Sequence, residues 1–415
     1  NAAKRSEDSN FDILELQFGH GYLVAQFFSD KVNEREDDYG GSFENRSRFG
    51  LEVLKEVQNV SDLPIIVRVS GDEMVENGIS LEEIKKFSKK LEEKGADAIH
   101  VSAGTACKTP SWYFQHMFTS KEKTWKMAEE IRHEVNLPVI AVGRINEHSD
   151  IDKVKEEDMA DFIAIGRPLI SDPNYVSKYF EDDNSYRPCL SCLDGCLGGV
   201  KSGEGLQCVM NPEIRNNKQF KTGKTNKSFV VVGGGLSGMT AAIYLDDKGN
   251  DVTLYEKDKL GGIFRYAPLP PGKEPLQKAL EYYEKELGRR DIEVIFEEAD
   301  ASDLNEFDEA IIATGSKPLI PPIEGLEEYE WADILLPGNM PENKKAMVIG
   351  GGLVGVETAY ALSENDNRVI LVELLPELAG NMFKLEKAQL LKKLENRDNI
   401  SIYTETDIKE VVGDI

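Results

Sequence analysis

The sequence predicts an α/β protein with a partial β/α (TIM) barrel, a cysteine-bearing connector and two Rossmann-like dinucleotide-binding domains. Three observations predict this arrangement. Five near-continuous apolar runs alternate with amphipathic segments in the first part of the chain, four cysteines crowd into a short stretch near the middle, and two strand-to-glycine turns follow. Repeated strand–helix units are typical of a parallel sheet, and a glycine turn between a strand and a helix is typical of a dinucleotide site.

The five apolar runs are the expected strands of the first domain. Parallel strands that are covered on both faces are apolar along their whole length. The segment after the second run has a helical pattern, with Ser80 as its N-cap and Gly95 as its stop signal. The five runs occupy residues 11–18, 64–70, 96–102, 138–143 and 161–166.

The length of 415 residues exceeds what one hydrophobic core usually serves, so several domains are expected. We place the barrel at residues 1–186, the connector at 187–226, the first dinucleotide-binding domain at 227–338 and the second at 339–415. A closed barrel has eight strands, of which five are visible, and the last domain ends before its sheet could be complete. We therefore expect a fragment that is truncated at both ends.

The composition argues against several classes of protein. A formal net charge of -26 opposes binding to nucleic acid or to anionic lipid. No apolar run approaches the roughly 18 residues of a membrane span, and the opening segment lacks the pattern of a signal peptide. We expect a cytoplasmic protein whose partner is a small molecule, with no nucleic-acid or membrane partner. The sequence leaves the formation of a homo-oligomer open.

The first glycine turn contains Gly233, Gly235 and Gly238. Glycines at this spacing permit a tight turn, close approach of the backbone to a pyrophosphate and close packing of the helix on the strand. The following helix then presents its positive N-terminal end to the phosphates. Glu256 ends the next apolar run, 23 positions after Gly233, where a carboxylate suits a ribose 2′-hydroxyl.

The second glycine turn repeats this pattern 117 positions later, with Gly350, Gly352 and Gly355. Glu373 again ends the next apolar run, 23 positions after the first glycine. A carboxylate there repels a 2′-phosphate, so the sequence favours NAD(H) over NADP(H) as the ligand of this turn.

Four of the five cysteines have the spacing C-x2-C-x3-C-x11-C, and they are Cys189, Cys192, Cys196 and Cys208. Without a secretion signal, such clustering indicates a metal site rather than disulfides. Soft thiolate ligands suit an iron–sulfur cluster or zinc, and a structural zinc ribbon more often has two C-x2-C pairs. We favour a [4Fe-4S] cluster, with zinc as the alternative. Cys107 lies apart and is expected to be a small buried residue.

A segment between the two turns resembles a known feature of flavin reductases. Ala313, Thr314 and Gly315 follow an apolar run. They resemble the return segment of reductases that bind two dinucleotides, where FAD occupies the first site and the nicotinamide coenzyme the second. The resemblance implies that residues 227–338 bind FAD and that residues 339–415 bind NAD(P)H.

The motifs GHGYLVAQFFSD and YGGSFENRSRF, followed by CLSC, GCLGG and LQCVMNP, resemble those of the old yellow enzyme family. Together they resemble its multidomain branch, which includes the 2,4-dienoyl-CoA reductases, the trimethylamine dehydrogenases and the clostridial enoate or bile-acid-type reductases. The resemblance covers essentially the whole chain. It implies FMN at the C-terminal face of a β/α barrel and a [4Fe-4S] cluster beside it.

The same resemblance implies catalytic residues. Tyr22 falls on the tyrosine that protonates the substrate carbon, and a phenol is a weak acid that donates only when strongly driven. His20 falls where the family uses His or Asn to bind the substrate carbonyl, and Gln17 falls where many relatives have a second His. The additional catalytic His of the dienoyl-CoA reductases would fall near Ala106 and is absent, which argues against a dienoyl-CoA substrate.

Five further residues are implied to bind FMN. Arg68 falls on the arginine beside the flavin N1–C2=O edge. Gly143 with Arg144, and Gly166 with Arg167, fall on the turns after barrel strands seven and eight, where barrels commonly bind phosphate.

The function implied by the resemblance is reduction of an activated C=C bond of an enoate, an enone or an enoyl thioester. Electrons are expected to pass from NADH through FAD and the [4Fe-4S] cluster to FMN. One alternative is a trimethylamine-dehydrogenase-like amine dehydrogenase that passes electrons outward, against which the intact second glycine turn argues. Another is a non-catalytic, zinc-stabilised nucleotide-binding protein.

Overall fold

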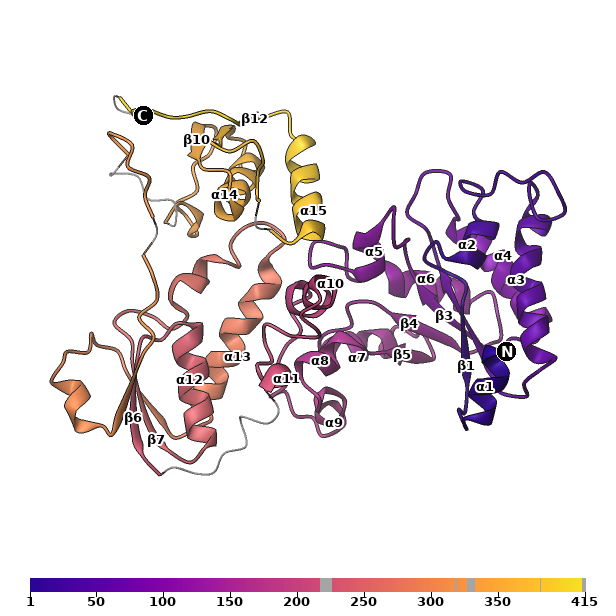
Figure 1. Cartoon of the computed structure of the whole chain (residues 1–415), viewed down its shortest axis with the longest axis horizontal. Helices are drawn as coiled ribbons and strands as arrows, with labels where there is room; N and C mark the ends of the chain where they lie inside the picture. The colour runs from indigo at the N-terminus through magenta and orange to yellow at the C-terminus, as the bar shows by residue number, and fades with distance from the viewer. Residues whose placement is uncertain (217–225, 318, 327–332, 381, 413–415) are drawn as a thin grey trace. The chain divides into compact units, whose positions relative to one another are not determined.

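The computed structural model describes two compact units, Asn1–Leu193 and Asp194–Ile415 (Figure 1). The boundary between them falls inside the cysteine-bearing segment. The four domain boundaries expected from the sequence are finer than this division and stay predictions. The described residues are 1–216, 226–317, 319–326, 333–380 and 382–412.

The first unit contains one five-stranded parallel sheet. Its strands follow one another in the order β1-β2-β3-β4-β5, which is the order of neighbouring strands in a β/α barrel. Each of the five predicted runs contains one strand, so the prediction of a parallel sheet is confirmed. The strands are β1 (Leu14–Gln17), β2 (Ile65–Ser70), β3 (Ala98–Ser102), β4 (Val139–Val142) and β5 (Phe162–Ala164).

Helices alternate with these strands and cover one face of the sheet. α4 packs against β2, and α6 packs against β3 and β4. Their cover buries alternate strand residues such as Val67, Val69 and Val101, because successive side chains in a strand point to opposite faces. The helices are α1 (Ala2–Asp8), α2 (Leu23–Phe28), α3 (Phe43–Gln58), α4 (Leu81–Glu93), α5 (Pro110–Phe114), α6 (Lys123–Arg132), α7 (His148–Glu156), α8 (Arg167–Ser171) and α9 (Tyr175–Phe180).

The expected helix signals around α4 are confirmed. The Ser80 side chain accepts a hydrogen bond from Glu83 N, and the Glu83 side chain accepts one from Ser80 N, which forms a capping box. After the helix, Gly95 has φ +82°, a conformation that glycine adopts without a steric penalty.

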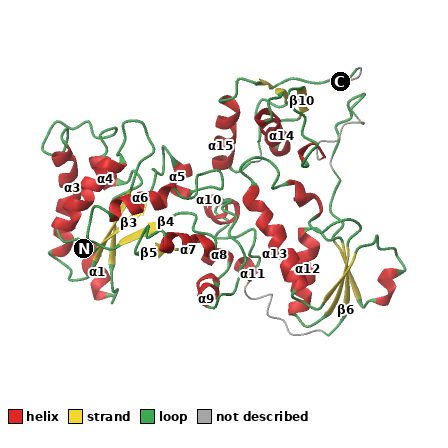
Figure 2. Cartoon of the chain, turned by 180° about the vertical axis from the view of Figure 1, so that it is seen from behind, coloured by secondary structure: helices red, strands yellow, loops and turns green. Residues whose placement is uncertain are grey.

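The second unit contains two parallel sheets, of which the β6 sheet is prominent in yellow in Figure 2. The first has the order β8-β7-β6-β9 and the second has the order β10-β11-β12. In each sheet the strand that precedes a glycine turn pairs with the strand that ends near the predicted acidic residue. The strands are β6 (Ser228–Val232), β7 (Asp251–Tyr255), β8 (Ile292–Ile295), β9 (Glu309–Ile312), β10 (Lys345–Ile349), β11 (Arg368–Val372) and β12 (Ile400–Tyr403).

The helices of the second unit connect and cover these strands. α12 packs against β6 and β7, and α14 packs against β10 and β11. The helical elements are η1 (Asp194–Gly198), α10 (Gly199–Ser202), α11 (Glu213–Asn216), α12 (Leu236–Asp247), η2 (Gly262–Tyr266), η3 (Glu274–Leu276), α13 (Gln277–Gly288), η4 (Asp303–Glu306), η5 (Asp333–Leu335), α14 (Leu353–Glu364) and α15 (Lys384–Glu395).

A buried ion cluster joins the two halves of this unit. Lys273 precedes η3, in the half that contains the first glycine turn. It pairs with Glu357 on α14 and with Glu386 on α15, the latter at 2.9 Å. Lys273 and Glu357 are both buried. Burial alone would lower the pKa of Lys273, but the two carboxylates outweigh it and raise that pKa above its usual value.

Candidate functional site

A row of polar side chains crosses the first sheet near the carboxyl ends of its strands. The register aligns Gln17 on β1 with Arg68 on β2, and Arg68 with His100 on β3. Glu15, two positions before Gln17, accepts a hydrogen bond from His100 Nδ1 at 2.7 Å, and its other oxygen lies 3.9 Å from Arg68 Nη1. The row therefore brings the predicted flavin arginine and the predicted substrate-binding Gln17 onto one face of the sheet.

The polar atoms of this row favour a ligand with both acceptor and donor atoms. Burial alone would raise the pKa of Glu15, but the hydrogen bond from His100 and the charge of Arg68 outweigh it and lower that pKa. Arg68 Nε and His100 Nε2 are buried and have no hydrogen-bond partner in the described part of the chain. Buried polar groups are normally hydrogen-bonded, so these atoms fit the polar edge of a flavin ring.

The sequence interpretation missed Glu15 and His100. The signal that could have found them is alternation along each strand. Glu15 stands two positions before Gln17, and His100 is a polar residue inside an otherwise apolar run. Residues two apart in a strand share a face, so Glu15 should have been grouped with Gln17. His100 is on another strand and joins the row through the register of the sheet.

His20 lies immediately beyond this row and is held in an uncommon conformation. Its φ is +65°, its N–H donates to Ser70 Oγ at 2.8 Å, and its Nε2 lies 2.8 Å from Ser102 Oγ. The preceding Gly19 is required by close packing, since a Cβ there would lie 2.6 Å from Ser70 N. The turn is thus fixed to the ends of β2 and β3.

His20 is neutral in this environment. Burial, together with the positive charge of Arg68 and the nearby His100, lowers the pKa of His20 from 6.5 to about 3. Its Nδ1 is buried and has no partner among the described residues. When Ser102 donates to Nε2, Nδ1 carries the proton, so His20 offers a neutral N–H rather than an imidazolium.

Tyr22 follows this turn at the N-cap of α2, and its side chain is 45% exposed. Its hydroxyl lies 3.5 Å from the hydroxyl of Tyr113, a residue that the sequence interpretation missed. Gln17 Oε1 accepts a hydrogen bond from Gly19 N at 3.0 Å, so this side chain also supports the turn. The three predicted catalytic residues, Tyr22, His20 and Gln17, thus lie on one short segment at the end of β1.

The two predicted phosphate-binding arginines meet at one segment of backbone. Arg144 donates through Nη1 to Met117 O at 2.9 Å and also to Thr119 O, and Arg167 donates to Gln115 O at 2.9 Å. Burial, followed by the charge of Arg167, lowers the pKa of Arg144 from 12.5 to about 10. Arg144 is therefore cationic at neutral pH, and two neighbouring guanidinium groups fit a phosphate dianion.

The glycines of these two turns have opposite surroundings. Gly143 has φ +119°, and a Cβ there would collide with the Gln115 side chain at 2.4 Å. A Cβ at Gly166 would meet nothing within 4 Å. Arg144 Nε is buried without a partner in the described ranges. An unsatisfied donor beside open backbone fits the phosphate of FMN, as the resemblance implied.

The first glycine turn of the second unit is close-packed. Gly233 has φ +108°, and a Cβ there would lie 2.4 Å from Ala313 O, while a Cβ at Gly238 would lie 1.8 Å from Gly233 O. A Cβ at Gly235 would meet nothing within 4 Å. Glu256 accepts hydrogen bonds from Gly234 N at 2.7 Å and from Asp258 N at 2.9 Å. The acidic residue is therefore bonded to the turn itself.

The second glycine turn shares most of these contacts, although a Cβ at Gly350 would meet nothing within 4 Å. A Cβ at Gly355 would lie 1.7 Å from Gly350 O, and one at Gly352 would meet nothing within 4 Å. Glu373 accepts hydrogen bonds from Gly351 N at 2.6 Å and from Leu375 N at 2.7 Å. Helix α14 begins at this turn as α12 begins at the first, so the repeat expected from sequence extends to individual hydrogen bonds.

The segment Ala313, Thr314 and Gly315 returns to the first glycine turn. Ala313 N donates to Val232 O at 2.8 Å. A Cβ at Gly233 would collide with the carbonyl oxygen of Ala313. Gly315 has φ +72°. The three residues therefore lie beside the first turn, as expected for a return segment.

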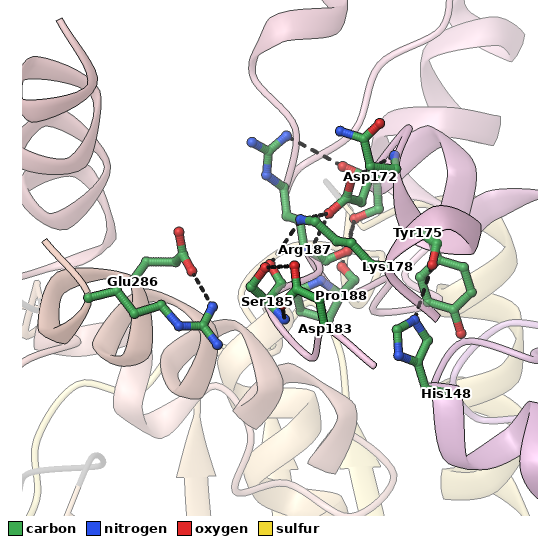
Figure 3. A network of polar contacts seen from close by, with 12 residues as sticks. His148, Asp172, Tyr175, Lys178, Asp183, Ser185, Arg187, Pro188 and Glu286 are labelled. Atoms are coloured by element: carbon green, nitrogen blue, oxygen red, sulfur yellow. Dashed lines mark hydrogen bonds and ion pairs between the residues drawn. The ribbon is translucent and has the colours of Figure 1, made fainter. Parts of the chain in front are cut away.

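The cysteine segment is anchored to the first unit by its N-terminal side (Figure 3). Asp172 accepts hydrogen bonds from Lys178 Nζ and Arg187 N, both at 2.9 Å. Ser171 Oγ donates to Pro188 O, immediately before Cys189, at 2.8 Å. Between Cys189 and Cys192, Ser191 accepts a hydrogen bond from Asn146 Nδ2 at 2.6 Å. The backbone around the first two predicted ligands is thus well fixed.

Within the described ranges, neither unit by itself contains a metal site formed by the cysteines. All five lie in described ranges and none forms a disulfide. Within those ranges, no three His, Cys, Asp or Glu side chains are arranged to hold a metal ion. Cys189 and Cys192 belong to the first unit, and Cys196 and Cys208 to the second. The four-cysteine site therefore stays a prediction. The expectation for Cys107 was wrong: it is exposed, because it lies in the loop after β3 rather than in the core.

No helix in the described ranges is long and apolar enough to cross a membrane.

The folds and the site residues define a class of flavin- and nicotinamide-nucleotide-binding oxidoreductases. Residues 1–184 match the NADH:flavin oxidoreductase / NADH oxidase family, and residues 227–415 match the pyridine nucleotide-disulphide oxidoreductase family. The chain belongs to the multidomain branch of the old yellow enzyme family, as the motifs indicated.

Individual relatives agree with this assignment. The chain is 39% identical to an NADH oxidase of Thermoanaerobacter brockii, over 94% of this chain and 63% of the relative. It is 32% identical to a bilirubin reductase of Mediterraneibacter gnavus, over 99% of this chain and 66% of the relative. A solved 2-naphthoyl-CoA reductase complex is 26% identical with a TM-score of 0.91, over 99% of this chain and 64% of that one. The chain thus spans less than two thirds of each.

Proposed function

We propose that this protein is an NADH-dependent flavin and iron–sulfur oxidoreductase that reduces an activated C=C bond. Its substrate class is an enoate, an enone or an enoyl thioester. The observation that carries the proposal is the second glycine turn. The close approach at Gly355, the open space at Gly352 and the carboxylate-to-backbone bond of Glu373 repeat those of the first turn. An intact second turn supports a nicotinamide coenzyme as electron donor rather than an enzyme that only passes electrons outward.

Four groups of residues would hold the cofactors. FMN would lie against Arg68, Gly143, Arg144, Gly166 and Arg167. FAD would lie at the first turn, against Gly233, Gly235, Gly238, Glu256, Ala313, Thr314 and Gly315. NADH would lie at the second, against Gly350, Gly352, Gly355 and Glu373. A [4Fe-4S] cluster would be bound by Cys189, Cys192, Cys196 and Cys208. Bound in this way, the cofactors supply hydride transfer at the two flavins and single-electron transfer at the cluster.

The chain's own residues would prepare the substrate. With Ser102 donating to Nε2, neutral His20 would hold its proton on Nδ1 for a carbonyl oxygen, and Gln17 adds a neutral amide nearby. Hydrogen-bond donors at that oxygen stabilise the negative charge that develops on it. Tyr22 holds the proton that reaches the carbon beside the one receiving hydride. Because its ring is partly exposed, water can restore that proton.

The bilirubin and 2-naphthoyl-CoA reductases among the similar proteins support reduction of an unsaturated substrate. Glu373 supports NADH rather than NADPH, since its carboxylate repels a 2′-phosphate. This carboxylate is already bonded to two backbone N–H groups, so its position is fixed before any nucleotide arrives.

The test separates the two half-reactions in the holoenzyme. Anaerobic NADH should bleach the bound flavin rapidly, and the reduced enzyme should then be reoxidised by an enone, an enoate or an enoyl thioester. Tyr22→Phe should slow reoxidation and leave bleaching intact. Equal loss of both half-reactions would refute the role of Tyr22, and absence of bleaching by NADH would favour the amine-dehydrogenase alternative. Zinc without acid-labile sulfide in the purified protein would exclude the cluster.

A further inference from the structure

A second tyrosine lies against both catalytic candidates. Tyr113 belongs to α5, after β3, and its ring centroid lies 4.4 Å from that of His20. It meets the Tyr22 ring edge-on, with centroids 6.5 Å apart and an interplanar angle of 81°. Their hydroxyl oxygens are 3.5 Å apart, so either can donate to the other. Tyr113 is thus the described residue whose hydroxyl is bonded to the hydroxyl of Tyr22.

The backbone holds Tyr113 in this place from the start of its helix. Ala106 N donates to His20 O at 3.0 Å, which joins the loop after β3 to the His20 turn. Thr109, the N-cap of α5, accepts a hydrogen bond from Thr105 N at 2.8 Å and donates to Glu73 O at 2.7 Å. Because these bonds connect α5 to the same turn that bears Tyr22, the two phenols are held by one hydrogen-bonded framework.

Close packing at Gly104 fixes the other side of the helix. Gly104 has φ +75°, and a Cβ there would lie 2.6 Å from Trp112 Cβ and 3.0 Å from Tyr113 N. Real Cβ contacts do not come this close without a shift of the backbone, so only glycine allows α5 to approach so near. The position of Tyr113 is therefore determined by the fold rather than by the contact with Tyr22 alone.

The direction of the hydrogen bond follows from burial. Tyr113 is half-buried, whereas the Tyr22 side chain is 45% exposed. Burial, and then the hydrogen bond to Tyr22, raises the pKa of Tyr113 above its usual value. A negative charge on Tyr113 is thus disfavoured by burial. Because Tyr22 is the more exposed of the two residues, we assign the donor role to Tyr113.

We propose that Tyr113 is a positioning residue that donates a hydrogen bond to Tyr22 and stabilises the phenolate formed when Tyr22 protonates the substrate. The inference rests on the proposed function. In this step the Tyr22 O–H bond breaks and a C–H bond forms at the carbon next to the one that receives hydride. The two electrons come with that hydride. The remaining phenolate accepts a proton from water, and Tyr113 keeps its own proton throughout.

The test is Tyr113→Phe in the holoenzyme, which removes one oxygen and keeps the ring on His20. A hydrogen bond to a charged group is lost, so we expect reduction of an enone or enoate to slow about tenfold, equivalent to about 1.4 kcal/mol in the barrier. The KM for the alkene, the FMN content and flavin bleaching by NADH should not change. The solvent deuterium isotope effect on flavin reoxidation should rise, because proton transfer becomes slower relative to the other steps.

A double-mutant cycle distinguishes this role from a structural one. In a Tyr22→Phe background there is no phenolate to stabilise, so adding Tyr113→Phe should cause no further loss. The matched control is Tyr179→Phe on α9. It removes a hydroxyl that donates to Asp152 at 2.8 Å and should leave alkene reduction unchanged.

The possible results separate the two claims. Additive losses in the cycle, an unchanged isotope effect, or loss of FMN from Tyr113→Phe would overturn the role of Tyr113 and leave the proposed function standing. If Tyr22→Phe itself reduces alkenes at the normal rate, the acid assigned under the proposed function is wrong.

Discussion

The packing of the second glycine turn gives the sharpest prediction, because neighbouring glycines in it have opposite surroundings. A Cβ at Gly355 would lie 1.7 Å from Gly350 O and 2.9 Å from its carbonyl carbon. The start of α14 would have to retreat by about 1.3 Å before that contact reached 3.0 Å. A Cβ at Gly352 would meet nothing within 4 Å, and the φ of Gly352 is -67°, which alanine adopts without strain.

Alanine at these two positions should therefore separate folding from nucleotide binding. Gly355→Ala should lower the free energy of unfolding by about 1–3 kcal/mol, as overpacking does. It should also weaken NAD⁺ binding about a hundredfold, since a displacement of about 1 Å at a site has effects of that order. Gly352→Ala should leave stability within about 0.5 kcal/mol. It should nevertheless weaken NAD⁺ binding, because the added methyl group occupies space that we assign to the pyrophosphate.

The assay is calorimetric titration with NAD⁺, paired with the melting temperature of each variant. Gly238→Ala is the matched control at the first turn, where a Cβ would lie 1.8 Å from Gly233 O. It should reduce FAD content and leave NAD⁺ affinity nearly unchanged. The reasoning is refuted if Gly355→Ala melts and binds NAD⁺ like the wild type. Full NAD⁺ affinity in Gly352→Ala would show that the coenzyme binds elsewhere.

Four further predictions follow from other contacts. Glu373→Gln should reduce the preference for NADH over NADPH about tenfold in kcat/KM, because it removes a carboxylate that opposes the 2′-phosphate. Arg167→Met should weaken FMN binding about 10- to 100-fold, measured by flavin fluorescence, through loss of a charge-assisted hydrogen bond. Lys273→Met should lower the free energy of unfolding by about 3–5 kcal/mol in denaturant titrations, because it leaves the buried Glu357 and the half-buried Glu386 without their cation. Finally, burial lowers the pKa of His20 to about 3, against 6.5 in the unfolded chain. The neutral form of His20 therefore contributes fully to stability above pH 6.5, and this contribution is lost as the pH falls toward 3. In His20→Asn, the free energy of unfolding should fall less steeply over this pH range, by about 1 kcal/mol per pH unit.

Glu256→Gln should affect FAD retention and leave the coenzyme preference alone. Normal FMN affinity in Arg167→Met would place the phosphate elsewhere. Stability should recover in part when Glu357→Gln is combined with Lys273→Met, and a double variant as unstable as the single one would contradict the role of the pair. An unchanged pH profile in His20→Asn would mean that His20 titrates normally.

Local patterns were sufficient to predict most of the fold. The strands of the first sheet and both glycine turns are encoded in short segments, where apolar runs and glycine spacing have a direct conformational meaning. The same holds for Glu256 and Glu373, whose positions at strand ends were predicted. The hydrogen bonds that these carboxylates accept from Gly234 N and Gly351 N were not predicted. The resemblance implied only a contact with the ribose, whereas the backbone contact becomes visible only when the turn is folded.

Contacts between distant segments could not be predicted from one sequence. Tyr22 and Tyr113 are 91 positions apart, and His100 and Glu15 are 85 apart. Nothing in the local pattern of either partner indicates the other. The wrong expectation for Cys107 has a related cause, since a single cysteine carries no information on whether its loop packs inward. For the four clustered cysteines, spacing alone predicts a ligand set, and their meeting in space depends on the conformation of the loop between them.

The buried cluster around Lys273 has a consequence for motion within the second unit. Glu357 lies two positions after Gly355, so the helix that starts at the coenzyme turn is pinned to the other half of the unit close to its first turn. Separating the ions would leave charged groups buried without a partner, which is energetically costly. Any swing of one half against the other would therefore have to break these ion pairs or turn about them.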